Sequence, residues 1–444
     1  MLKTFKLGGV HPAENKLSNN SPIQVLPIPK QVFIPVSQSL GAPSKPVVNK
    51  GDQVKVGQLI AKGEAFISSN IHSSVSGKVL KIDNITDQSD YPKQAIFINV
   101  EGDEWDENID KSDKVKREIT LSKEEIIRKI HEMGIVGLGG AAFPSHVKLM
   151  VPKGKKADLL IINGVECEPY LTSDYRLMLE KGEEILIGTT ILMKGLGVNK
   201  AFIGIENNKP DAIKHLTNLA KDFEGIEVFS LKVKYPQGGE KQLIKALTNR
   251  EVPSGKLPIE VGCVVNNVGT AFAVYEAVQK NKPLFERVVT VTGKTIENPS
   301  NFLVRIGTPS SELVEKAGGL PDDTGKIISG GPMMGKALNM IDVPIVKGSS
   351  GVLLIEDSET ERIAVKNCIR CANCISVCPM GLEPVLLAQY SEKEMFENAE
   401  KEHILDCMEC GSCQYTCPSG RPLLDYIRLG KFKVGEIIRN RGKK

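Results

Sequence analysis

The sequence predicts a multidomain protein in which β domains accompany an α/β domain and a cysteine-rich C-terminal domain. In the first 110 residues, short runs rich in valine and isoleucine alternate with proline and glycine turns, which is typical of small β domains. Between residues 120 and 280, strand-like and helix-like stretches alternate, which predicts an α/β sheet. Eight of the ten cysteines lie between residues 368 and 417. A chain of 444 residues is long enough for about three or four such domains.

Charge and hydropathy argue against two classes of function. The 57 basic and 54 acidic residues give a net charge of +3, which offers no electrostatic surplus for nucleic acid, so we expect no nucleic-acid partner. No apolar run approaches the roughly 20 residues that a membrane-spanning helix needs. The nearest candidate, residues 185–198, is interrupted by threonine, glycine and Lys194. Any contact with a membrane is therefore expected to be peripheral.

The first 112 residues are expected to form the N-terminal β domain. Residues 50–61 and 73–79 resemble the two hairpins of a biotinyl or lipoyl carrier domain, which is a barrel-sandwich hybrid. A carrier needs a lysine at the hairpin tip, whereas residues 66–71 read Phe-Ile-Ser-Ser-Asn-Ile, so we interpret the domain as a structural or docking barrel. His11, in the loop Gly-Gly-Val-His-Pro, stands alone and is interpreted as structural.

A charged linker at residues 103–118 precedes the α/β domain, which we expect at residues 119–282. Ser122 and Glu125 form a capping-box pattern in front of its first amphipathic helix. The expected strands are 158–162, 201–205, 226–233 and 263–265, and the expected helices include 126–133, 211–219 and 240–247.

Three loop motifs lie where such a domain would bind a ligand. Residues 137–145 read Gly-Leu-Gly-Gly-Ala-Ala-Phe-Pro-Ser; the glycines permit close approach, and the helix that follows attracts phosphate at its N-terminus. Residues 163–169 read Asn-Gly-Val-Glu-Cys-Glu-Pro and follow a buried strand, the usual ligand position in α/β sheets. Residues 264–270 again place asparagines at a strand end. A plain tight turn is the alternative for the first loop.

The C-terminal cysteines form two runs with the spacing C-x2-C-x2-C-x3-C-P. In such runs three thiolates bind one cubane cluster, and the fourth, which precedes proline, reaches the other cluster. Two structural zinc sites are the alternative, although zinc needs neither the third cysteine nor the proline. Disulfides are disfavoured, because we find no signal peptide and expect a reducing compartment. The predicted ligands are Cys368, Cys371, Cys374 and Cys417 for cluster one, and Cys407, Cys410, Cys413 and Cys378 for cluster two.

Four motifs together resemble those that bind FMN and NADH in the flavoprotein subunit of respiratory complex I. They are residues 139–148, 163–169, 235–240 and 266–270. With the Gly-Gly-Val-His-Pro N-terminus and the double cysteine run, the whole chain is similar to the C-subunit family of the Rnf ion-translocating ferredoxin:NAD oxidoreductases. The complex I subunit usually carries an acidic residue where Val165 stands, and a single cluster motif where this chain has two. The second difference favours the Rnf family.

The resemblance implies two [4Fe-4S] clusters, FMN, and NAD(H) as substrate. No side chain is expected to act as a general acid or base, and the leftover thiols Cys167 and Cys263 are interpreted as structural. The expected cofactor-binding residues are the loop glycine Gly137; Gly139, Gly140, Lys148, Asn163, Glu166, Asn266 and Asn267 at FMN; Phe143 and Glu168 near the nucleotide; and Gly239 and Glu240 near either.

The remaining segments complete the expected domain order. Residues 284–346 resemble the β-grasp ligand-binding domain of both families, and their loop 330–335 either reaches a ligand or partner or is a plain turn. Residues 358–436 are expected to form the two-cluster ferredoxin domain, which we take as the helical type because residues 384–399 read helical. A compact ββα ferredoxin is the alternative. The basic tail 428–444 is interpreted as a solvated end, with anionic lipid or an acidic partner as the alternative.

The resemblance implies an electron-transfer subunit that is bound peripherally at the cytoplasmic side of the cell membrane. It would pass electrons between nicotinamide, FMN and the clusters, while ferredoxin would act through another subunit of the complex. One alternative is the diaphorase subunit of a soluble hydrogenase or dehydrogenase complex. Another is a non-enzymatic scaffold that connects two clusters and binds no flavin.

Overall fold

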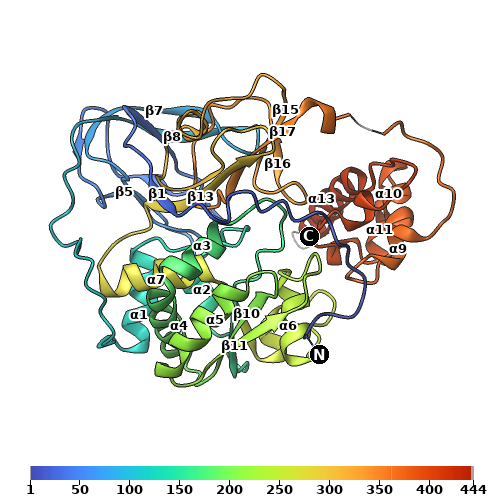
Figure 1. The fold of residues 1–444 in the computed structure, drawn as a ribbon, viewed down its shortest axis with the longest axis horizontal. Helices are drawn as coiled ribbons and strands as arrows, with labels where there is room; N and C mark the ends of the chain where they lie inside the picture. Colours follow the sequence, from blue (N-terminus) through green and yellow to red (C-terminus); the bar gives the residue numbers. More distant parts are fainter. Residues whose placement is uncertain (1, 362, 442–444) are drawn as a thin grey trace.

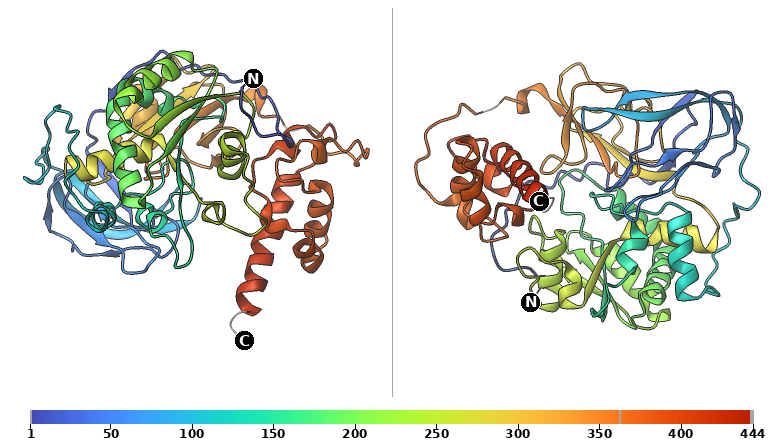
Figure 2. Two further views of the ribbon diagram at one scale, coloured as in Figure 1. Left: turned by 90° about the horizontal axis from the view of Figure 1, so that it is seen from below. Right: turned by 180° about the vertical axis from the view of Figure 1, so that it is seen from behind.

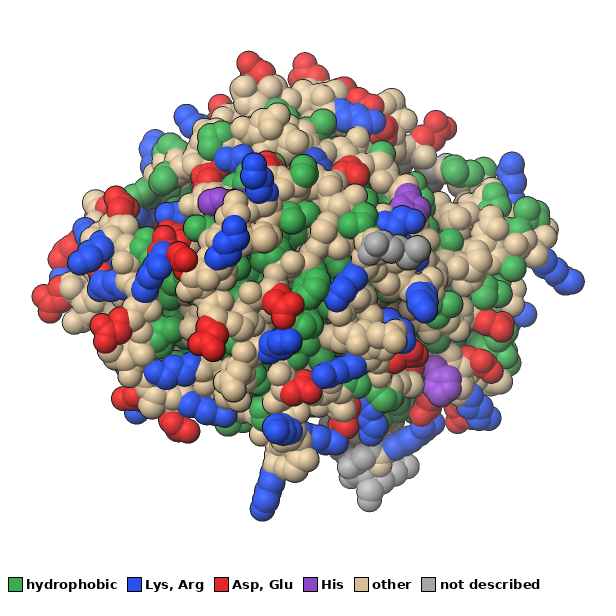
Figure 3. All heavy atoms as spheres, turned by 60° about the horizontal axis from the view of Figure 1, so that its bottom comes forward, with side chains coloured by type: hydrophobic (Ala, Val, Ile, Leu, Met, Phe, Trp, Pro, Cys, Tyr) green, Lys and Arg blue, Asp and Glu red, His purple; other side chains and the backbone are tan. Residues whose placement is uncertain are grey.

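The computed structural model of the protein describes residues 2–361 and 363–441. Two β domains lie along one side of the α/β domain, and a helical domain packs at one end of the molecule (Figure 1). On the face shown in Figure 3, basic and acidic side chains are intermixed, in keeping with the net charge of +3. None of the described helices is long and apolar enough to cross a bilayer.

The N-terminal domain is a barrel of two small sheets whose core is aliphatic, with Val32, Ile34 and Ile96 fully buried. A carrier domain would hold a mobile lysine at the hairpin tip, whereas here the tip is held in place by a hydrogen bond from another domain. The buried Lys347 Nζ donates to Asn70 O in this tip at 2.7 Å, which supports the interpretation as a structural barrel. The sheets are β2 (Gln31–Pro35), β8 (Pro92–Val100), β7 (Gly77–Thr86) and β4 (Gln53–Val54), and β3 (Lys45–Pro46), β5 (Leu59–Lys62) and β6 (Ile71–His72).

The α/β domain contains a parallel sheet in the order β11-β10-β9-β12, with helices on both faces (Figure 1). Alternate residues of β9 contribute to two cores. Leu160 and Ile162 belong to a core with six of the helices, whereas Leu159 and Ile161 belong to a core with α6 on the other face. The predicted capping box at Ser122 is present at the start of α1. The strands are β9 (Leu159–Asn163), β10 (Ala201–Glu206), β11 (Ile226–Leu231) and β12 (Cys263–Asn267). The helices are α1 (Lys123–Glu132), α2 (Ser145–Leu149), α3 (Ser173–Glu180), α4 (Gly182–Leu196), α5 (Pro210–Leu219), α6 (Glu240–Thr248) and α7 (Val268–Gln279).

The third domain is a mixed sheet that carries one helix, α8 (Ser310–Lys316). Its edge strand β1 (Ile23–Val25) comes from the N-terminal segment and pairs with β14 (Ser300–Arg305), an association that the local sequence does not predict. The buried Asn301 explains it, because its amide donates to Ser18 O at 3.0 Å and to Ser21 O at 3.2 Å. The other strands are β13 (Glu286–Gly293), β14 (Ser300–Arg305), β15 (Thr324–Ser329), β16 (Lys336–Leu338) and β17 (Gly351–Glu356).

The C-terminal domain is helical, and residues 363–441 contain no strand, so the ββα alternative is not favoured. The helical stretch expected at 384–399 is divided into two helices at Glu394, whose φ is +56°. The last helix projects from the domain (Figure 2) and contains residues 428–441 of the basic tail. Residues 442–444 lie outside the described part. The helices are α9 (Asn373–Ser376), α10 (Pro384–Glu392), α11 (Phe396–Lys401), α12 (Ser412–Tyr415) and α13 (Leu423–Arg441).

Candidate cofactor and cluster sites

Polar side chains gather at the carboxyl edge of the parallel sheet, as the loop motifs predict. Asn163 ends β9 and Asn267 ends β12, and the two residues lie opposite each other in the register of these strands. The Asn163 amide donates to Gly238 O at 2.9 Å, and its Oδ1 accepts from Val165 N at 3.1 Å. Asn163 therefore joins its own loop to the loop that carries Gly238.

The glycine loop 137–145 is tight on one side and open on the other. One of its backbone amides donates to Thr270 Oγ1 at 2.9 Å. A Cβ atom at Gly139 would lie 3.1 Å from Asn267 Cβ, so a larger residue here would have to displace Asn267 slightly. At Gly140, whose φ is +134°, a Cβ atom would meet nothing within 4 Å. The open side leaves room for a ligand directly over the backbone.

The other predicted residues of this region close the loop or lie beside it. Gly137 N donates to Phe143 O at 2.8 Å, and the Phe143 side chain is half-buried. Lys148, on α2, extends its ammonium group to Glu240 Oε1 at 3.1 Å and to Val265 O at 2.9 Å. The structure thus brings the lysine and the carboxylate of two separate motifs together.

The two asparagines at the end of β12 have different surroundings. Asn267 Oδ1 accepts from Gly269 N at 2.8 Å and caps α7, while its amide donates to Asp174 Oδ2 at 2.6 Å. Asn266 is only 4% exposed, and its amide nitrogen has no hydrogen-bond partner among the described residues. Leaving a buried donor unpaired costs about 1–3 kcal/mol. Such a donor fits a site that a ligand acceptor completes.

Glu166 uses its side chain within the protein. Its φ is +48°, and its carboxylate accepts from Asp174 N at 2.8 Å and Tyr175 N at 3.2 Å, at the start of α3. A negative charge at this position also interacts favourably with the helix dipole. The carboxylate of Glu166 therefore stabilises the helix that follows the loop.

Glu168, two residues further on, contacts the third domain instead. Its carboxylate accepts from Met333 N at 3.1 Å and Met334 N at 2.7 Å, in the loop 330–335. A side chain at Gly331 would collide with this carboxylate. Burial raises the pKa of Glu168 to about 7, against the opposing effect of the two amides. The loop 330–335 thus contacts the α/β domain of its own chain, and whether it also reaches a ligand or partner stays a prediction.

The raised pKa of Glu168 predicts a pH-dependent stability. Because the folded protein holds this proton more tightly than the unfolded chain does, its contribution to stability is complete below the ordinary pKa of 4.5 and is lost as the pH rises through about 7. We therefore expect the free energy of unfolding to fall between about pH 4.5 and about pH 7, and Glu168→Gln to remove part of that fall. Urea unfolding of the cluster-loaded protein at several pH values measures it. Glu124→Gln, at an exposed position on α1, is the control and should keep the wild-type slope; an unchanged slope in Glu168→Gln would contradict the prediction.

Both cysteine runs contribute to one apolar pocket in the helical domain. Burial raises the pKa of Cys407 to about 11 and also raises the pKa values of Cys410 and Cys413. These thiols line the pocket. Among the described residues, no group of three or more His, Cys, Asp or Glu side chains is arranged with the geometry of a metal site. Four thiols in an apolar pocket fit the ligand set of a [4Fe-4S] cluster. The pocket is lined by Cys378, Cys407, Cys410 and Cys413, with Leu382, Leu387, Leu424 and Ile427 among its apolar residues.

The other four cysteines lie nearer to the surface. Cys374 and Cys417 are half-buried against the core of the helical domain, and the two thiols are close enough to influence each other electrostatically. Cys368 and Cys371 are exposed. The assignment of these four residues to one cluster stays a prediction.

The cysteine pocket borders directly on the α/β domain. The buried Tyr235 hydroxyl donates to Cys410 O at 2.8 Å, across 175 residues of sequence. Gln242 Nε2 donates to Pro379 O at 3.2 Å, and a Cβ atom at Gly239 would lie 2.6 Å from the Met408 side chain. Tyr235 begins the motif at residues 235–240, but the sequence alone indicates no role for it. The motif Tyr-Pro-Gln-Gly-Gly at residues 235–239 was the only feature of the sequence that pointed to Tyr235.

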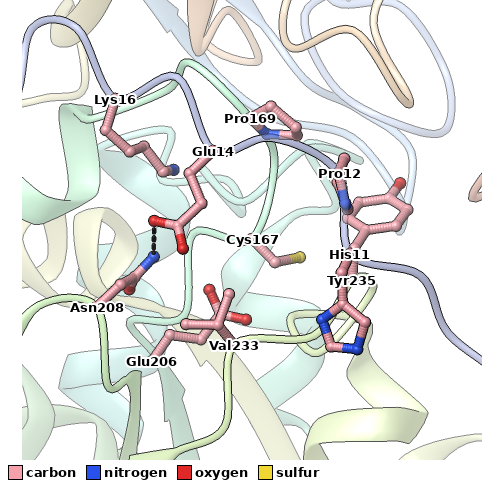
Figure 4. A pocket seen from close by; sticks show the side chains of 10 residues that line it. All are labelled: His11, Pro12, Glu14, Lys16, Cys167, Pro169, Glu206, Asn208, Val233 and Tyr235. Carbon is pink, nitrogen blue, oxygen red and sulfur yellow. Dashed lines mark hydrogen bonds between the residues drawn. The ribbon is translucent and has the colours of Figure 1, made fainter.

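A second pocket lies between the N-terminal segment and the sheet edge (Figure 4). Lys16, which lines this pocket, could not be predicted from the sequence, since a single lysine in a polar segment carries no signal. Cys167 Sγ accepts from Gly238 N at 3.3 Å, and burial raises the pKa of this thiol; Cys263 is buried in β12. The lining residues are His11, Pro12, Glu14, Lys16, Cys167, Pro169, Glu206, Asn208, Val233 and Tyr235.

Four family models match the chain in succession. They are the RnfC barrel sandwich hybrid domain at residues 3–103, the Nuo51 FMN-binding domain at 130–276, the SLBB domain at 288–337 and the 4Fe-4S dicluster domain at 360–418. With the site geometry, these matches define the class: an electron-transfer iron–sulfur flavoprotein that uses FMN and two [4Fe-4S] clusters. The predicted architecture and cofactors are thereby confirmed.

Curated relatives identify the family within this class. The C subunit of the proton-translocating ferredoxin:NAD(+) oxidoreductase complex of Clostridium ljungdahlii is 51% identical over 96% of this chain and 93% of its own length. The C subunit of the Na(+)-translocating ferredoxin:NAD(+) oxidoreductase complex of Acetobacterium woodii is 44% identical over 97% of each. The chain therefore belongs to the C-subunit family of ion-translocating ferredoxin:NAD oxidoreductase complexes, as its motifs suggest.

Among solved structures, a chain of an air-oxidized NAD+-reducing [NiFe]-hydrogenase is similar, with a TM-score of 0.50 and 17% sequence identity. The match covers 69% of this chain and 61% of that chain. At this identity it shows a shared fold only. The family match therefore decides between the alternatives, and the soluble hydrogenase subunit is not favoured.

Proposed function

We propose that this chain carries electrons between NAD(H) and two [4Fe-4S] clusters as the NAD-reactive subunit of an ion-translocating complex. Bound FMN exchanges electrons in pairs with nicotinamide and singly with iron–sulfur clusters. The observation that carries the proposal is the contact between Tyr235 and Cys410, because it joins the loop at the expected flavin site to the cysteine pocket. In this proposal the subunit lies peripherally at the cytoplasmic side of the membrane, and ferredoxin reacts through a partner subunit.

Each part of the sheet edge has a role in this proposal. The open loop at Gly140 and the ammonium group of Lys148 suit a phosphate, and the unpaired amide of Asn266 donates to an acceptor of the flavin. The proposed FMN residues are Gly137, Gly139, Gly140, Lys148, Asn163, Glu166, Asn266 and Asn267, with Phe143 and Glu168 at the nucleotide and Gly239 and Glu240 beside either.

The two clusters take different positions in the proposed path. The pocket of Cys378, Cys407, Cys410 and Cys413 borders the flavin loops, so these cysteines would hold the cluster that can exchange electrons with FMN. The exposure of Cys368 and Cys371 suits a cluster that exchanges electrons with a partner subunit. With the groups bound, cluster two would lie between the flavin and cluster one, and cluster one would lie nearest to the partner subunit.

Anaerobic reconstitution with iron, sulfide and FMN tests the proposed function. We expect NADH to bleach first the flavin absorbance and then that of the clusters. If FMN binds but NADH has no effect, the nucleotide roles of Phe143 and Glu168 are wrong. If both clusters form but no flavin binds, the chain is a non-enzymatic scaffold and the proposed enzymatic function is wrong.

Gly140→Trp is expected to abolish flavin binding without unfolding the protein. A Cβ atom at Gly140 meets open space, so the indole would occupy the room proposed for the ligand. We expect FMN affinity to fall by about 100-fold or more, equivalent to about 2.8 kcal/mol, as measured by flavin fluorescence. Gly154→Trp is the control, because Gly154 also has a positive φ and open space but lies in another loop. Wild-type FMN affinity in Gly140→Trp would remove this loop from the flavin site.

A further inference from the structure

Residues 8–16 cross the junction between the α/β and helical domains, and we call this segment the strap. At one end, Gly9 N donates to Val377 O at 2.8 Å, beside the cysteine pocket. In the middle, Val10 and Tyr235 exchange two backbone hydrogen bonds of 2.8 and 2.9 Å. At the other end, Lys16 reaches the loop 163–171. One short segment therefore touches both proposed redox sites.

Lys16 binds the main chain of the flavin loop at three points. Its ammonium group donates to Glu166 O at 2.8 Å, to Glu168 O at 2.9 Å and to Leu171 O at 2.7 Å. Burial, and secondarily Lys209, lowers its pKa to about 8. A charged group is costly to bury, so its three acceptors have to be held in a fixed arrangement around it. Lys16 thereby fixes the shape of the loop.

The loop needs this support because its backbone is strained. Glu166 and Tyr170 have φ values of +48° and +70°, a conformation that costs a residue other than glycine about 1 kcal/mol or more. The strap supports the second residue directly, since Tyr170 N donates to Glu14 O at 2.9 Å. From the other side, Lys209 donates to Val165 O at 2.8 Å. The conformation of the loop thus depends on contacts from outside it.

The opposite end of the strap is anchored by close backbone contact. Gly8 has a φ of +65°, and a Cβ atom there would lie 2.5 Å from the carbonyl carbon and oxygen of Cys378. Only glycine allows the strap to approach this cysteine so closely. A change at Gly8 would move the strap and the cysteine loop apart without touching the flavin loop.

A small pocket with both polar and apolar lining lies between the strap and the sheet edge along part of the strap (Figure 4). Glu14 spans it with a hydrogen bond to Asn208 Nδ2 at 2.8 Å. In this stretch the strap is held by hydrogen bonds more than by an apolar core. Substitutions in the strap should therefore alter its position more than the fold of the domains.

We infer that the strap is a positioning element that sets the spacing between the flavin loop and the pocket of cluster two, with Lys16 and Gly8 as its anchors. The inference rests on the proposed function for the two sites. Electron transfer between two buried centres falls steeply with their separation, so a loosened strap slows that step. Neither anchor is a catalytic residue, because both act through the main chain of the loops that they hold.

The test uses the full chain loaded with both clusters and FMN, and compares Lys16→Met and Gly8→Ala with two controls. Lys214→Met changes an exposed lysine on α5, and Gly154→Ala changes a glycine that has a positive φ but open space. We expect Lys16→Met to speed amide hydrogen exchange in residues 163–171 and to weaken FMN binding, each about tenfold. We expect Gly8→Ala to keep the FMN affinity and the rate of flavin bleaching by NADH, while cluster bleaching slows about tenfold.

Unchanged exchange in the loop of Lys16→Met, or cluster bleaching in both variants at the control rate, would overturn the inference. If Gly8→Ala loses iron, Lys16→Met decides alone, because the Lys16 ammonium group binds the loop 163–171 and not the two cysteine runs. Hydrogen exchange is also measured with clusters but without FMN and NADH. If the wild-type protein bound no flavin, the proposed function would fail, whereas altered exchange in Lys16→Met would still support the mechanical role of the strap.

Discussion

Cys378→Ser should remove the cluster next to the flavin loops, although residue 378 belongs to the first cysteine run. In the structure, Cys378 lines the apolar pocket together with three cysteines of the second run. Serine keeps the size of the side chain but offers oxygen, a poor substitute for a soft thiolate ligand of an iron–sulfur cluster. Bound iron should fall by about half. NADH should still bleach the flavin, and the remaining cluster should stay oxidised for lack of its neighbour.

Cys417→Ser is the matched variant, because its cysteine occupies the equivalent place in the other run. It should also lose about half of the iron. The remaining cluster is then the one beside the flavin, so NADH should bleach it at the wild-type rate. Cys263→Ser, at a buried cysteine outside both runs, should keep all of the iron. Normal bleaching of the cluster that remains in Cys378→Ser would reverse the proposed order of the clusters.

Local patterns carried most of the fold prediction. The alternation of Leu159 to Ile162 between two cores is visible in the sequence as an apolar run that is buried on both faces. The capping box at Ser122 could likewise be predicted from the sequence, because its partner Glu125 is only three residues away. Strand β1 was not predicted, because its three residues form a strand only by pairing with β14. Elements that depend on distant partners leave little trace in the local sequence.

The candidate site shows the same division. Gly140 and Asn267 could be proposed from their motifs, because open loops and strand ends are local features. Glu166 and Glu168 read alike in the sequence, yet one caps α3 and the other binds the loop 330–335. The direction of the Glu166 side chain depends on its backbone geometry. The direction of the Glu168 side chain depends on a domain more than 160 residues away in the sequence. The burial of Lys16 is equally invisible, because it results from the assembly of three loop carbonyls around it.

Asn266→Leu should stabilise the flavin-free protein and weaken flavin binding at the same time. The Asn266 amide is buried and unpaired among the described residues, a state that costs about 1–3 kcal/mol. Leucine has a similar size and no polar group, so we expect the free energy of unfolding without FMN to rise by about 1 kcal/mol. The loss of a donor to the ligand should lower FMN affinity by about tenfold to a hundredfold. Urea unfolding and flavin fluorescence titration measure the two effects separately.

The neighbouring Asn267→Leu provides a control of opposite sign. Its side chain already caps α7 and donates to Asp174, so its removal should lower the free energy of unfolding of the flavin-free protein by about 1 kcal/mol or more. A residue that serves the fold loses stability when its polar group is removed, whereas a residue whose polar group is reserved for a ligand gains it. If Asn266→Leu destabilised the flavin-free protein as Asn267→Leu does, the unpaired amide would be structural, and the central donor of the proposed flavin site would be lost.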